Sequence, residues 1–590
     1  MVRRNPDGTI SDVTAAPFDV RTRVHEMGGG AALVANGIVY FSNFSDNRLY
    51  RQQRDSTPKP LAQNPNSRYA EPVIDQARNR LICVREDHRA DGGEPDNLLV
   101  GLPLDGSGQG ILVSGADFYS TPRLSPDGRK LSWLSWNHPN LPWIGTELWV
   151  GEFDTEGKIV APRRVAGSDD ESIFQPEWSP EGILTFVSDR NGWWNFYLEK
   201  DGKVQSILPL EAEFGRAQWV LGMSTYGFVS ETKLVCSYVQ KGIGHLALLD
   251  LTGGSLTDLD LPYTEFSQLR VNDHRVFVMA GAHDRPTSLV QFDLSPSQLE
   301  VVRQSSDVLE NAALSAYLSL PRFVEFPSGD RTAFAWYYPP TNPDYQPLPG
   351  EKPPLVVKSH GGPTSSASST LNLRNAYWTS RGYAVVDVDY SGSTGYGRSY
   401  RNRLHRQWGI VDVEDCANVV AYLAAQGLAD GARAFIMGGS AGGYATLCAL
   451  TFGDTFRGGA SYYGISDLEA LIADTHKFES RYTDWLIGQY PEDKETYRAR
   501  SPIHFTERLS APVIFFQGED DKIVPPNQAE LMVEALRRKG LPVGYLLFKG
   551  EGHGFRKAEN IARALDAELD FYTSILFPPK TPLDVTPDNG

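Results

Sequence analysis

The sequence has little cysteine and no long apolar run. Four cysteines occur among 590 residues, and no two of them form a C-x-x-C pair. Such sparse cysteines provide neither a disulfide framework nor a zinc site, so we expect free and mostly buried thiols at Cys83, Cys236, Cys416 and Cys448. No run is long enough to span a bilayer, and no apolar segment follows the two arginines near the N-terminus. We therefore expect a cytoplasmic protein without a membrane partner.

Positive charge is also scarce. The chain carries 56 Lys and Arg against 73 Asp and Glu, a formal net charge of −17, and the basic residues are scattered. A surface of this charge repels the phosphates of nucleic acids and anionic lipids, so neither is an expected partner. With 41% hydrophobic residues, the chain can still bury large cores. Its length suits two globular domains, which we place at residues 1–320 and 321–590.

One glycine-rich turn is the most informative part of the sequence. Gly438-Gly439-Ser440-Ala441-Gly442 follows the apolar run Ala434 to Met437 and precedes a helix-like stretch from Tyr444 to Leu450. A nucleophilic serine on a strained strand-to-helix turn has this pattern, and flanking glycines are needed because side chains would crowd the turn. A G-x-S-x-G match also arises by chance in roughly one of three chains of this length. The surrounding sequence must therefore decide whether Ser440 is a nucleophile.

A carboxylate and a histidine follow the turn in the chain order that an α/β-hydrolase requires. The apolar run 513–516 leads to Asp521, and the apolar run 543–548 leads to His553. A serine hydroxyl becomes a good nucleophile when an imidazole takes its proton and a carboxylate fixes the imidazole tautomer. We therefore predict a triad in which Ser440 attacks, His553 is the base and Asp521 orients it.

The acid has two rivals in its own turn. Asp520 and Glu519 precede Asp521 directly, and the position in the turn favours Asp521. Taken alone, an Asp in such a run or a His between glycines is more often a turn residue than a catalytic one. The joint order of serine, acid and histidine on matching local structures favours the catalytic interpretation.

Acyl transfer also needs two donors for the oxyanion. The backbone N–H after the nucleophile belongs to Ala441. A predicted strand at Leu355 to Lys358 ends in Ser359-His360-Gly361-Gly362-Pro363, where the glycine pair lets the backbone approach a substrate closely. We predict the N–H groups of Gly362 and Ala441 as the oxyanion hole.

The region between nucleophile and acid is expected to contact the substrate. Glu479 and Arg481 lie in a segment where α/β-hydrolases place insertions, and either charge could bind a peptide terminus. A solvated surface position is the alternative for both. Tyr444, four residues after the nucleophile, is the third predicted substrate contact.

The first half of the chain consists of short β-rich runs separated by turn signals. Six units can be counted, with inner strands near residues 33–42, 72–85, 123–135, 176–188, 227–238 and 268–280. Ser125-Pro126-Asp127-Gly128 recurs as Ser179-Pro180-Glu181-Gly182, an offset of 179 − 125 = 54 residues. A period near 50 is typical of four-stranded propeller blades. A pair of β-sandwiches is the alternative.

Five motifs of the second half resemble the prolyl oligopeptidase family, with its acylaminoacyl-peptidase branch as the nearest match. They are HGGP from His360, DYSGSTGYGR from Asp389, GGSAGGY from Gly438, DDKIVP from Asp520 and EGHGF from Glu551. The resemblance implies the same triad and the same two oxyanion donors. It also implies an N-terminal β-propeller that covers an α/β-hydrolase and restricts access to short peptides.

The resemblance leads us to expect seven blades, although six units are counted. A seventh would require residues from the N-terminus and from Ser305 to Leu320. Relatives usually have more strand sequence before the segment that matches Asp19 to Glu26, so an incomplete first blade is expected.

The main functional hypothesis is a serine peptidase that cleaves short peptides or acyl-peptides near the N-terminus, without metal or organic cofactor. A carboxylesterase or small-amide hydrolase is the alternative, because the same triad serves any acyl transfer. A propeller scaffold with a decayed hydrolase is disfavoured, since no catalytic position is missing. A free N-terminus would need a buried carboxylate, and an acylated one a neutral slot. The paired-glutamate helix of dipeptidyl peptidases is not evident, and a homo-oligomer stays open.

Overall fold

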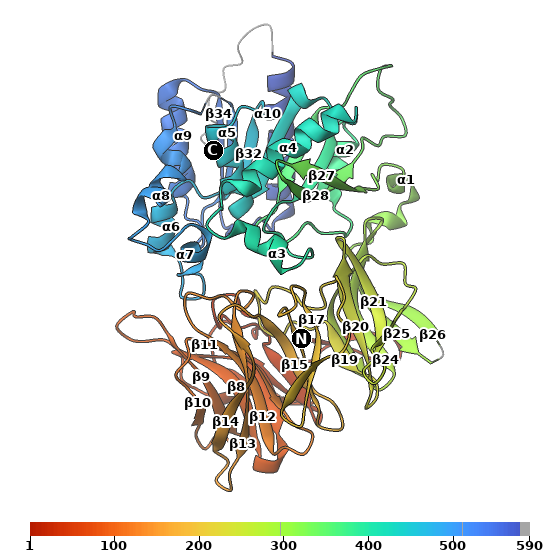
Figure 1. The fold of residues 1–590 in the computed structure, drawn as a ribbon, viewed down its shortest axis with the longest axis vertical. Coiled ribbons are helices and arrows are strands. Elements are labelled where there is room, and N and C mark those ends of the chain that lie inside the picture. The colour runs from red at the N-terminus through yellow and green to blue at the C-terminus, as the bar shows by residue number, and fades with distance from the viewer. Residues whose placement is uncertain (296, 510, 579–590) are drawn as a thin grey trace.

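The protein consists of a β-propeller and an α/β-hydrolase stacked on one another (Figure 1). The computed structural model describes residues 1–295, 297–509 and 511–578. Six four-stranded sheets lie between Ala32 and Gln304, and an eight-stranded sheet begins at Arg322. The domain limits predicted from the sequence, 1–320 and 321–590, include the residues outside the described ranges and stay predictions.

Each propeller sheet is antiparallel and takes its four strands from one continuous stretch of chain. The first three blades are formed by β3 (Ala32–Ala35), β4 (Ile38–Ser42), β5 (Leu49–Gln53) and β6 (Lys59–Ala62); β7 (Ser67–Asp75), β8 (Arg80–Asp87), β9 (Asp96–Pro103) and β10 (Gly110–Val113); and β11 (Phe118–Leu124), β12 (Lys130–Trp136), β13 (Thr146–Phe153) and β14 (Ile159–Ser168). The other three are formed by β15 (Ile173–Trp178), β16 (Leu184–Ser188), β17 (Asn195–Lys200) and β18 (Lys203–Ser206); β19 (Tyr226–Phe228), β20 (Lys233–Gln240), β21 (Ile243–Asp250) and β22 (Ser255–Asp258); and β23 (Glu265–Asn272), β24 (Arg275–Ala282), β25 (Arg285–Leu294) and β26 (Ser297–Gln304).

The prediction of seven blades is wrong, and the six units counted in the sequence are the six blades. The N-terminal strands β1 (Val2–Arg4) and β2 (Ile10–Asp12) pair with each other in a separate two-stranded sheet. Residues 305–320 form the short helices η2 (Val308–Glu310) and α1 (Ala312–Ser315) in place of strands. The expected incomplete first blade is likewise wrong, because β3 to β6 form a full sheet.

A repeated irregularity marks the first strand of four blades. Glu71, Thr121, Gln175 and Gln268 all have positive φ, between 46° and 55°, and each sits where the pairing with the second strand shifts register. Such a bulge bends the strand and turns its side chain out of the ladder. The freed side chains join neighbouring blades, since the Glu71 carboxylate accepts the N–H of Thr121 at 2.5 Å.

A long irregular segment, residues 207–225 between β18 and β19, runs from the hydrolase side to these inner strands. The N–H of Gly222 donates to Glu71 Oε1 at 2.8 Å, and Leu221 bridges to Gly29. At Gly29, which has φ of 90°, a side chain would lie 2.2 Å from the Leu221 carbonyl oxygen. The segment therefore packs tightly against the inner ends of the blades.

The hydrolase sheet has the strand order β27-β28-β30-β29-β31-β32-β33-β34. Strand β28 pairs antiparallel with both of its neighbours, β27 and β30. All later pairs of the sheet, from β30 with β29 to β33 with β34, are parallel. Its strands are β27 (Arg322–Ser328), β28 (Arg331–Tyr338), β29 (Leu355–Ser359), β30 (Ala384–Asp389), β31 (Ala434–Gly439), β32 (Gly459–Tyr462), β33 (Val513–Gly518) and β34 (Val543–Phe548). The carboxyl ends of the parallel strands lie along one edge, where ligands of such sheets bind.

Helices cover both faces of this sheet. One apolar core packs side chains of α4, α5 and α9 against it, and a second packs α2 and α10 against the other face. The α-helices of this half are α2 (Leu373–Thr379), α3 (Arg398–Arg401), α4 (Val411–Ala425), α5 (Ala441–Phe452), α6 (Leu468–Asp474), α7 (Tyr482–Leu486), α8 (Lys494–Ala499), α9 (Asn527–Lys539) and α10 (Ala558–Leu576). Short α3 and α7 lie on the side that faces the propeller (Figure 1).

A buried ion cluster fixes the hydrolase on the propeller. Arg398 and Arg401 of α3 both reach the carboxylate of Asp189 in the propeller, and Arg398 Nη1 lies 2.6 Å from Asp189 Oδ2. Asp189 and Arg401 are 1% exposed, and the Arg401 guanidinium stacks 4.2 Å above the Trp194 ring. Removing Asp189 would take the nearest carboxylate from the buried Arg401 guanidinium, and loss of one partner of a buried pair costs about 3–5 kcal/mol. The two halves are therefore docked through paired charges.

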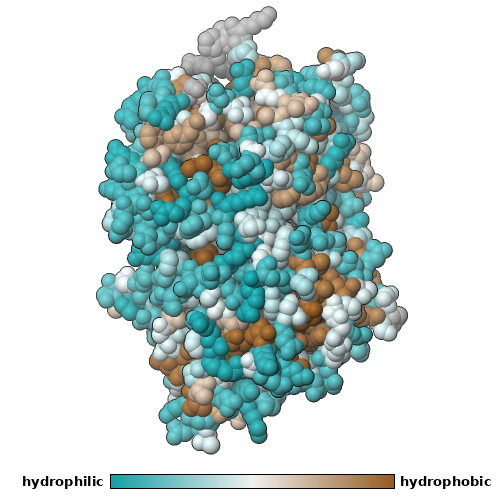
Figure 2. All heavy atoms as spheres, viewed as in Figure 1, coloured by the Kyte–Doolittle hydropathy of each residue, from teal (hydrophilic) through white to brown (hydrophobic). Residues whose placement is uncertain are grey.

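The face of the molecule drawn in Figure 2 is mostly hydrophilic. The four cysteines are free and buried. Among the described residues, no helix is long and apolar enough to cross a membrane.

Candidate functional site

Ser440 sits at the turn between β31 and α5 in a strained conformation. Its φ and ψ are 57° and −120°, which an L-residue adopts only when the surroundings impose it. The surroundings do so by close packing, because a side chain at Gly442 would lie 2.1 Å from the Ser359 carbonyl oxygen, and one at Gly438 would lie 2.4 Å from Gly442. The two flanking glycines of the motif are therefore required by space.

Asp521 and His553 meet at the same edge of the sheet. His553 Nδ1 lies 2.9 Å from Asp521 Oδ2, and Asp521 is 2% exposed. The other carboxylate oxygen accepts the N–H groups of Ile523 and Val524 at 2.9 and 3.0 Å. Asp520, the rival acid, is exposed. The structure therefore brings His553 to Asp521 and places the Nδ1 proton toward it, which leaves Nε2 as the acceptor.

Tyr463 lies between the serine turn and the histidine. Its ring centroid is 4.8 Å from that of His553, and a side chain on Gly439 would approach the Tyr463 ring to 2.9 Å. Ser440 N donates to the Tyr462 carbonyl at 3.0 Å. The three predicted triad residues thus gather around the end of β32.

The two predicted oxyanion donors lie beside the serine. Ala441 is the first residue of α5, where a backbone N–H has no partner within the helix and the helix dipole favours negative charge. Gly362 has φ of 123°, a conformation that favours glycine, and a side chain there would lie 2.9 Å from Thr364 N. A side chain on the preceding Gly361 would lie 3.7 Å from Ser440 Cβ. The loop of residues 360–365, which we call the oxyanion loop, therefore passes directly over the serine turn.

Two hydrolase side chains hold the start of this loop. Tyr390 OH donates to the carbonyl oxygens of His360 and Pro363 at 3.0 and 3.3 Å, and the Tyr390 ring stacks on the His360 ring at 4.1 Å. His360 Nε2 lies 2.7 Å from Ser393 Oγ. Burial lowers the pKa of His360 to about 4, so its imidazole is neutral at physiological pH and shares a hydrogen bond with Ser393.

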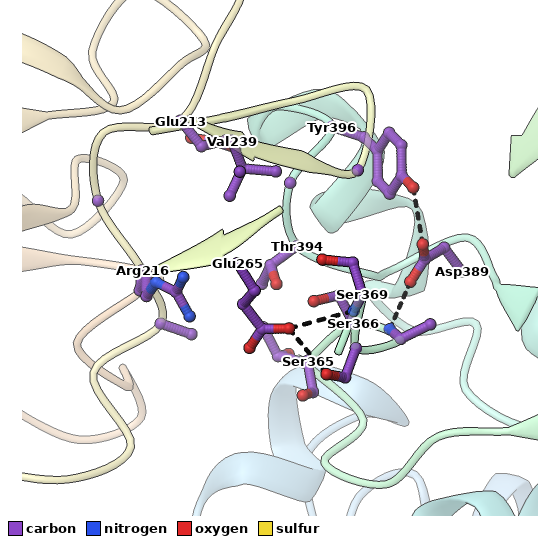
Figure 3. A pocket seen from close by; sticks show the side chains of 18 of the residues that line it. Glu213, Arg216, Val239, Glu265, Ser365, Ser366, Ser369, Asp389, Thr394 and Tyr396 are labelled. Carbon is purple, nitrogen blue, oxygen red and sulfur yellow. Dashed lines mark hydrogen bonds between the residues drawn. The ribbon is translucent and has the colours of Figure 1, made fainter. Parts of the chain in front are cut away.

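The end of the oxyanion loop borders a cavity at the junction of the two halves (Figure 3). The cavity has a volume of about 240 Å³. The segment 364–369 and the loop after β30 form its hydrolase wall, and residues 213–223, 239–244 and 264–265 form its propeller wall. Its contents would therefore contact both halves of the molecule.

Three carboxylates and one guanidinium are the charged groups among the described lining residues. Asp389, at the end of β30, is 1% exposed and accepts from Ala367 N at 2.7 Å and Tyr396 OH at 2.7 Å. Burial raises its pKa to about 7, and the nearby carboxylate of Asp387 acts in the same direction. Glu265 Oε2 accepts from Ser368 Oγ and Ser369 N (Figure 3). The cavity wall therefore carries one carboxylate from the hydrolase, Asp389, and one from the last propeller blade, Glu265.

Glu213 and Arg216 face the cavity from the irregular segment 207–225. Burial raises the pKa of Glu213 to about 7, although the Arg401 guanidinium 4.0 Å away acts in the opposite direction. Arg216 donates to the Phe266 carbonyl, and burial lowers its pKa. Neither residue, nor Glu265, belongs to a motif that could have identified it from the sequence.

The predicted substrate contacts lie apart from this cavity. Tyr444 is fully buried, packs on Trp408 at 4.5 Å and donates its hydroxyl to the Arg500 carbonyl at 2.9 Å. This packing corrects the prediction for Tyr444, whose side chain is buried between α5 and residues 408 and 500 and does not line the cavity. Glu479 pairs with His476 at 3.1 Å and Arg481 lies 3.8 Å from Asp484, and neither lines the cavity. Substrate contact by Glu479 and Arg481 stays a prediction.

One cluster in the propeller has the residue types of a metal site. Ligand atoms of Glu26, Glu86 and His88 lie within 4.8 Å of one another. The Arg68 guanidinium already pairs with both carboxylates, at 2.5 and 3.2 Å. A cation therefore occupies the place that a metal ion would take.

Comparison with known proteins agrees with this geometry. A model of the prolyl oligopeptidase family matches residues 369–577. A solved puromycin-hydrolyzing peptidase of Mycobacterium tuberculosis is 42% identical, with a TM-score of 0.91 over 97% of this chain and 90% of that one.

Two curated relatives match over a smaller share. Dipeptidyl peptidase family member 6 of Caenorhabditis elegans is 33% identical over 264 residues, which is 42% of this chain and 34% of the relative. The acylamino-acid-releasing enzyme of Arabidopsis thaliana is 30% identical over 215 residues, 35% of this chain and 28% of the relative. The matched part thus spans about a third of the length of these two relatives.

The match to an acylamino-acid-releasing enzyme fits the predicted branch, and the match to the mycobacterial peptidase extends over both halves of the molecule. This chain belongs to the prolyl oligopeptidase family.

Proposed function

We propose that the protein is a serine peptidase that removes residues from the N-terminus of short peptides. The contact between His553 Nδ1 and Asp521 Oδ2 at 2.9 Å, beside the strained turn of Ser440, is the observation that carries the proposal. His553 Nε2 takes the proton of the Ser440 hydroxyl as Oγ attacks the scissile carbonyl. The imidazolium then protonates the leaving amine, and water hydrolyses the acyl-enzyme by the same route.

The N–H groups of Ala441 and Gly362 stabilise the negative oxygen of the tetrahedral intermediate. Both are backbone donors fixed before the substrate arrives, so no reorganisation accompanies the reaction. Asp521 keeps its charge and stabilises the imidazolium throughout.

We further propose that the substrate carries a free N-terminus. The cavity beside the oxyanion loop presents Asp389, Glu265 and Glu213 against a single guanidinium, that of Arg216. A substrate ammonium would pair with Glu265 and favour the ionised forms of Asp389 and Glu213, whose pKa values burial raises to about 7, whereas an acylated N-terminus would supply no charge to pair with these carboxylates. Arg216 is placed to contact a carbonyl oxygen of the same substrate.

Three chromogenic substrates separate this function from its rivals: a free aminoacyl anilide, its N-acetyl counterpart and a short-chain ester. We expect Ser440-dependent cleavage of the free anilide, with slower turnover of the acetylated one. Faster cleavage of the acetylated anilide would identify an acylaminoacyl peptidase, and turnover of the ester alone would identify a carboxylesterase. The Ser440→Ala variant is the control for contaminating hydrolases. The mycobacterial relative is named as a puromycin-hydrolyzing peptidase, so puromycin is a fourth substrate to test.

The division into domains 1–320 and 321–590 is part of the same proposal. Short peptides are the proposed partners, and no cofactor is required by the chemistry. Cytoplasmic location and a homo-oligomer stay predictions of the sequence.

A further inference from the structure

Among the described residues, two hydrogen bonds join the irregular segment 207–225 of the propeller to the hydrolase. Glu213 Oε1 accepts the N–H of Gly397 at 3.0 Å, next to the ion cluster of α3. Trp219 Nε1 donates to the carbonyl oxygen of Thr364 at 2.8 Å. Thr364 follows the predicted oxyanion donor Gly362 by two residues, so the second contact reaches the oxyanion loop itself.

The oxyanion loop depends on such contacts for its shape. It contains the pair Gly361-Gly362, and glycine places the weakest restraint on the backbone of any residue. The N–H of Gly362 must nevertheless point at a fixed position to stabilise an oxyanion. Hydrogen bonds from outside the loop therefore have to supply the order that its own sequence lacks.

Thr364 is the anchor at the far end of the loop. It is 1% exposed, and its N–H and hydroxyl both contact Tyr482 OH, at 3.2 and 2.5 Å. Its carbonyl oxygen takes the indole N–H of Trp219. Within the described part of the chain, all other side-chain hydrogen bonds to the oxyanion loop come from the hydrolase, so Trp219 is the contribution of the propeller.

Aromatic packing holds Trp219 in position. Its ring lies 4.3 Å from that of Trp143 at an angle of 43°, and 5.9 Å from the ring of Tyr482. Trp143 is 1% exposed, and its own indole N–H has no hydrogen-bond partner among the described residues. The two tryptophans thus have the same ring in the same cluster, but only one of them bonds to the oxyanion loop.

We propose that Trp219 is a positioning residue for the oxyanion hole. Its indole N–H, delivered by the propeller, fixes the Thr364 peptide and through it aims the N–H of Gly362. The inference rests on acyl transfer at Ser440 as proposed above. It makes full activity of the hydrolase conditional on a docked propeller, since the propeller supplies the donor.

The test replaces each tryptophan of the pair by phenylalanine. Trp219→Phe keeps most of the ring and removes the N–H, whereas Trp143→Phe removes an N–H that bonds to nothing. For Trp219→Phe we expect kcat on the free aminoacyl anilide to fall about 10- to 100-fold with KM within about twofold, because loss of a whole oxyanion donor costs about 10²–10³ in kcat. Trp143→Phe should keep kcat within about threefold of the wild type.

A transition-state probe separates positioning from simple packing. A peptide aldehyde forms a tetrahedral adduct on Ser440, so its inhibition constant should rise in Trp219→Phe by the same factor as kcat falls. Binding of an uncleaved peptide to the Ser440→Ala, Trp219→Phe double variant should match binding to Ser440→Ala. Equal losses of kcat in both tryptophan variants, or a loss confined to KM, would overturn the proposal.

Folding and function are controlled separately. If Trp219→Phe has a lowered thermal midpoint, Tyr482→Phe removes the hydroxyl from the other side of Thr364 and should reproduce the fall in kcat and the weaker aldehyde inhibition. If neither variant changes the aldehyde constant, the oxyanion loop does not need these anchors and the inference is wrong. If wild-type turnover does not depend on Ser440, the proposed function fails instead.

Discussion

The two predicted oxyanion donors are held by different parts of the molecule. The N–H of Ala441 is positioned by contacts within the hydrolase. Gly442 packs so closely on the Ser359 carbonyl that the backbone of the serine turn has no room to shift toward it. The N–H of Gly362 belongs to a glycine-rich loop tied at Thr364 to the propeller residue Trp219. The nucleophile turn is thus built within one domain, whereas the proposed oxyanion hole is held by contacts from both.

The largest effect should come from the acid of the triad, which lies wholly on the hydrolase side. Asp521→Asn is expected to lower kcat about 10⁴-fold, because the amide favours the wrong imidazole tautomer at His553. Asp520 is one residue away and exposed, so the kcat of Asp520→Asn should stay within about twofold of the wild-type value. Steady-state rates on the free aminoacyl anilide measure both, and the reverse ranking would move the acid to Asp520.

The junction between the halves should respond to pH through Asp389. Its pKa is raised from an ordinary 3.8 to about 7, so the folded protein favours the protonated form. The raised pKa contributes to the free energy of unfolding in full below about pH 4, and this contribution is lost as the pH rises to about 7. At 1.36 kcal/mol per pKa unit, the loss in the free energy of unfolding is at most about 4 kcal/mol.

Asp389→Asn keeps both hydrogen bonds if the Tyr396 hydroxyl turns to accept, and it does not ionise. Relative to this variant, the wild type should lose stability between pH 5 and pH 8 in urea unfolding. Parallel curves for the two proteins over this range would show that Asp389 does not change its charge there.

A methyl group at Gly442 tests the packing that fixes the nucleophile. Gly442→Ala would place Cβ 2.1 Å from the Ser359 carbonyl oxygen, so the turn must shift. We expect kcat to fall about a hundredfold, the cost of a displacement near 1 Å, and stability to fall by about 1–3 kcal/mol. Gly253→Ala is the control, because its Cβ would meet open space. An active, stable Gly442→Ala enzyme would contradict the claim that space dictates this glycine.

The smallest effect is expected on the propeller side of the cavity. Glu265→Gln should raise KM for the free aminoacyl anilide about tenfold, the value of one charge-assisted hydrogen bond, and leave KM for the N-acetyl anilide unchanged. Glu300→Gln, in the same blade but on its last strand, should change neither. Equal shifts for the two anilides would remove Glu265 from recognition of the N-terminus.

The sequence predicted those features that local patterns encode. Strand-end motifs locate Ser440, Asp521 and His553, and in a parallel sheet such ends share one edge, so contact of Asp521 with His553 could be foreseen. Their catalytic roles stay predictions until rates are measured. The turns at Ser125 and Ser179 lie between the first and second strands of two successive blades, as the period near 50 predicted, and the six units counted from the strands are the six blades. The seventh blade came from the family resemblance, which the strand pairing of this chain does not follow.

Contacts between distant segments could not be predicted in this way. Trp219 and Arg216 lie in an irregular stretch without periodicity, and their partners Thr364 and Phe266 are set by the docking of the domains and the packing of the blades. Tyr444 was misjudged because position on α5 decides whether a side chain faces the sheet, the core or the substrate. Its neighbours Trp408 and Arg500 are far away in sequence, so the buried environment was not visible there.

The continuous origin of each blade has a mechanical consequence. No blade combines strands from the two ends of the propeller segment, so no sheet bridges the first and last blades. We call the junction between these two blades the split of the ring. Across the split, Arg4 of the N-terminal hairpin pairs with Glu300 of β26 at 2.6 Å, and both side chains are more than 40% exposed. An exposed pair of this kind contributes less than about 1 kcal/mol. We therefore expect the ring to open more readily at this junction than within any of its six sheets.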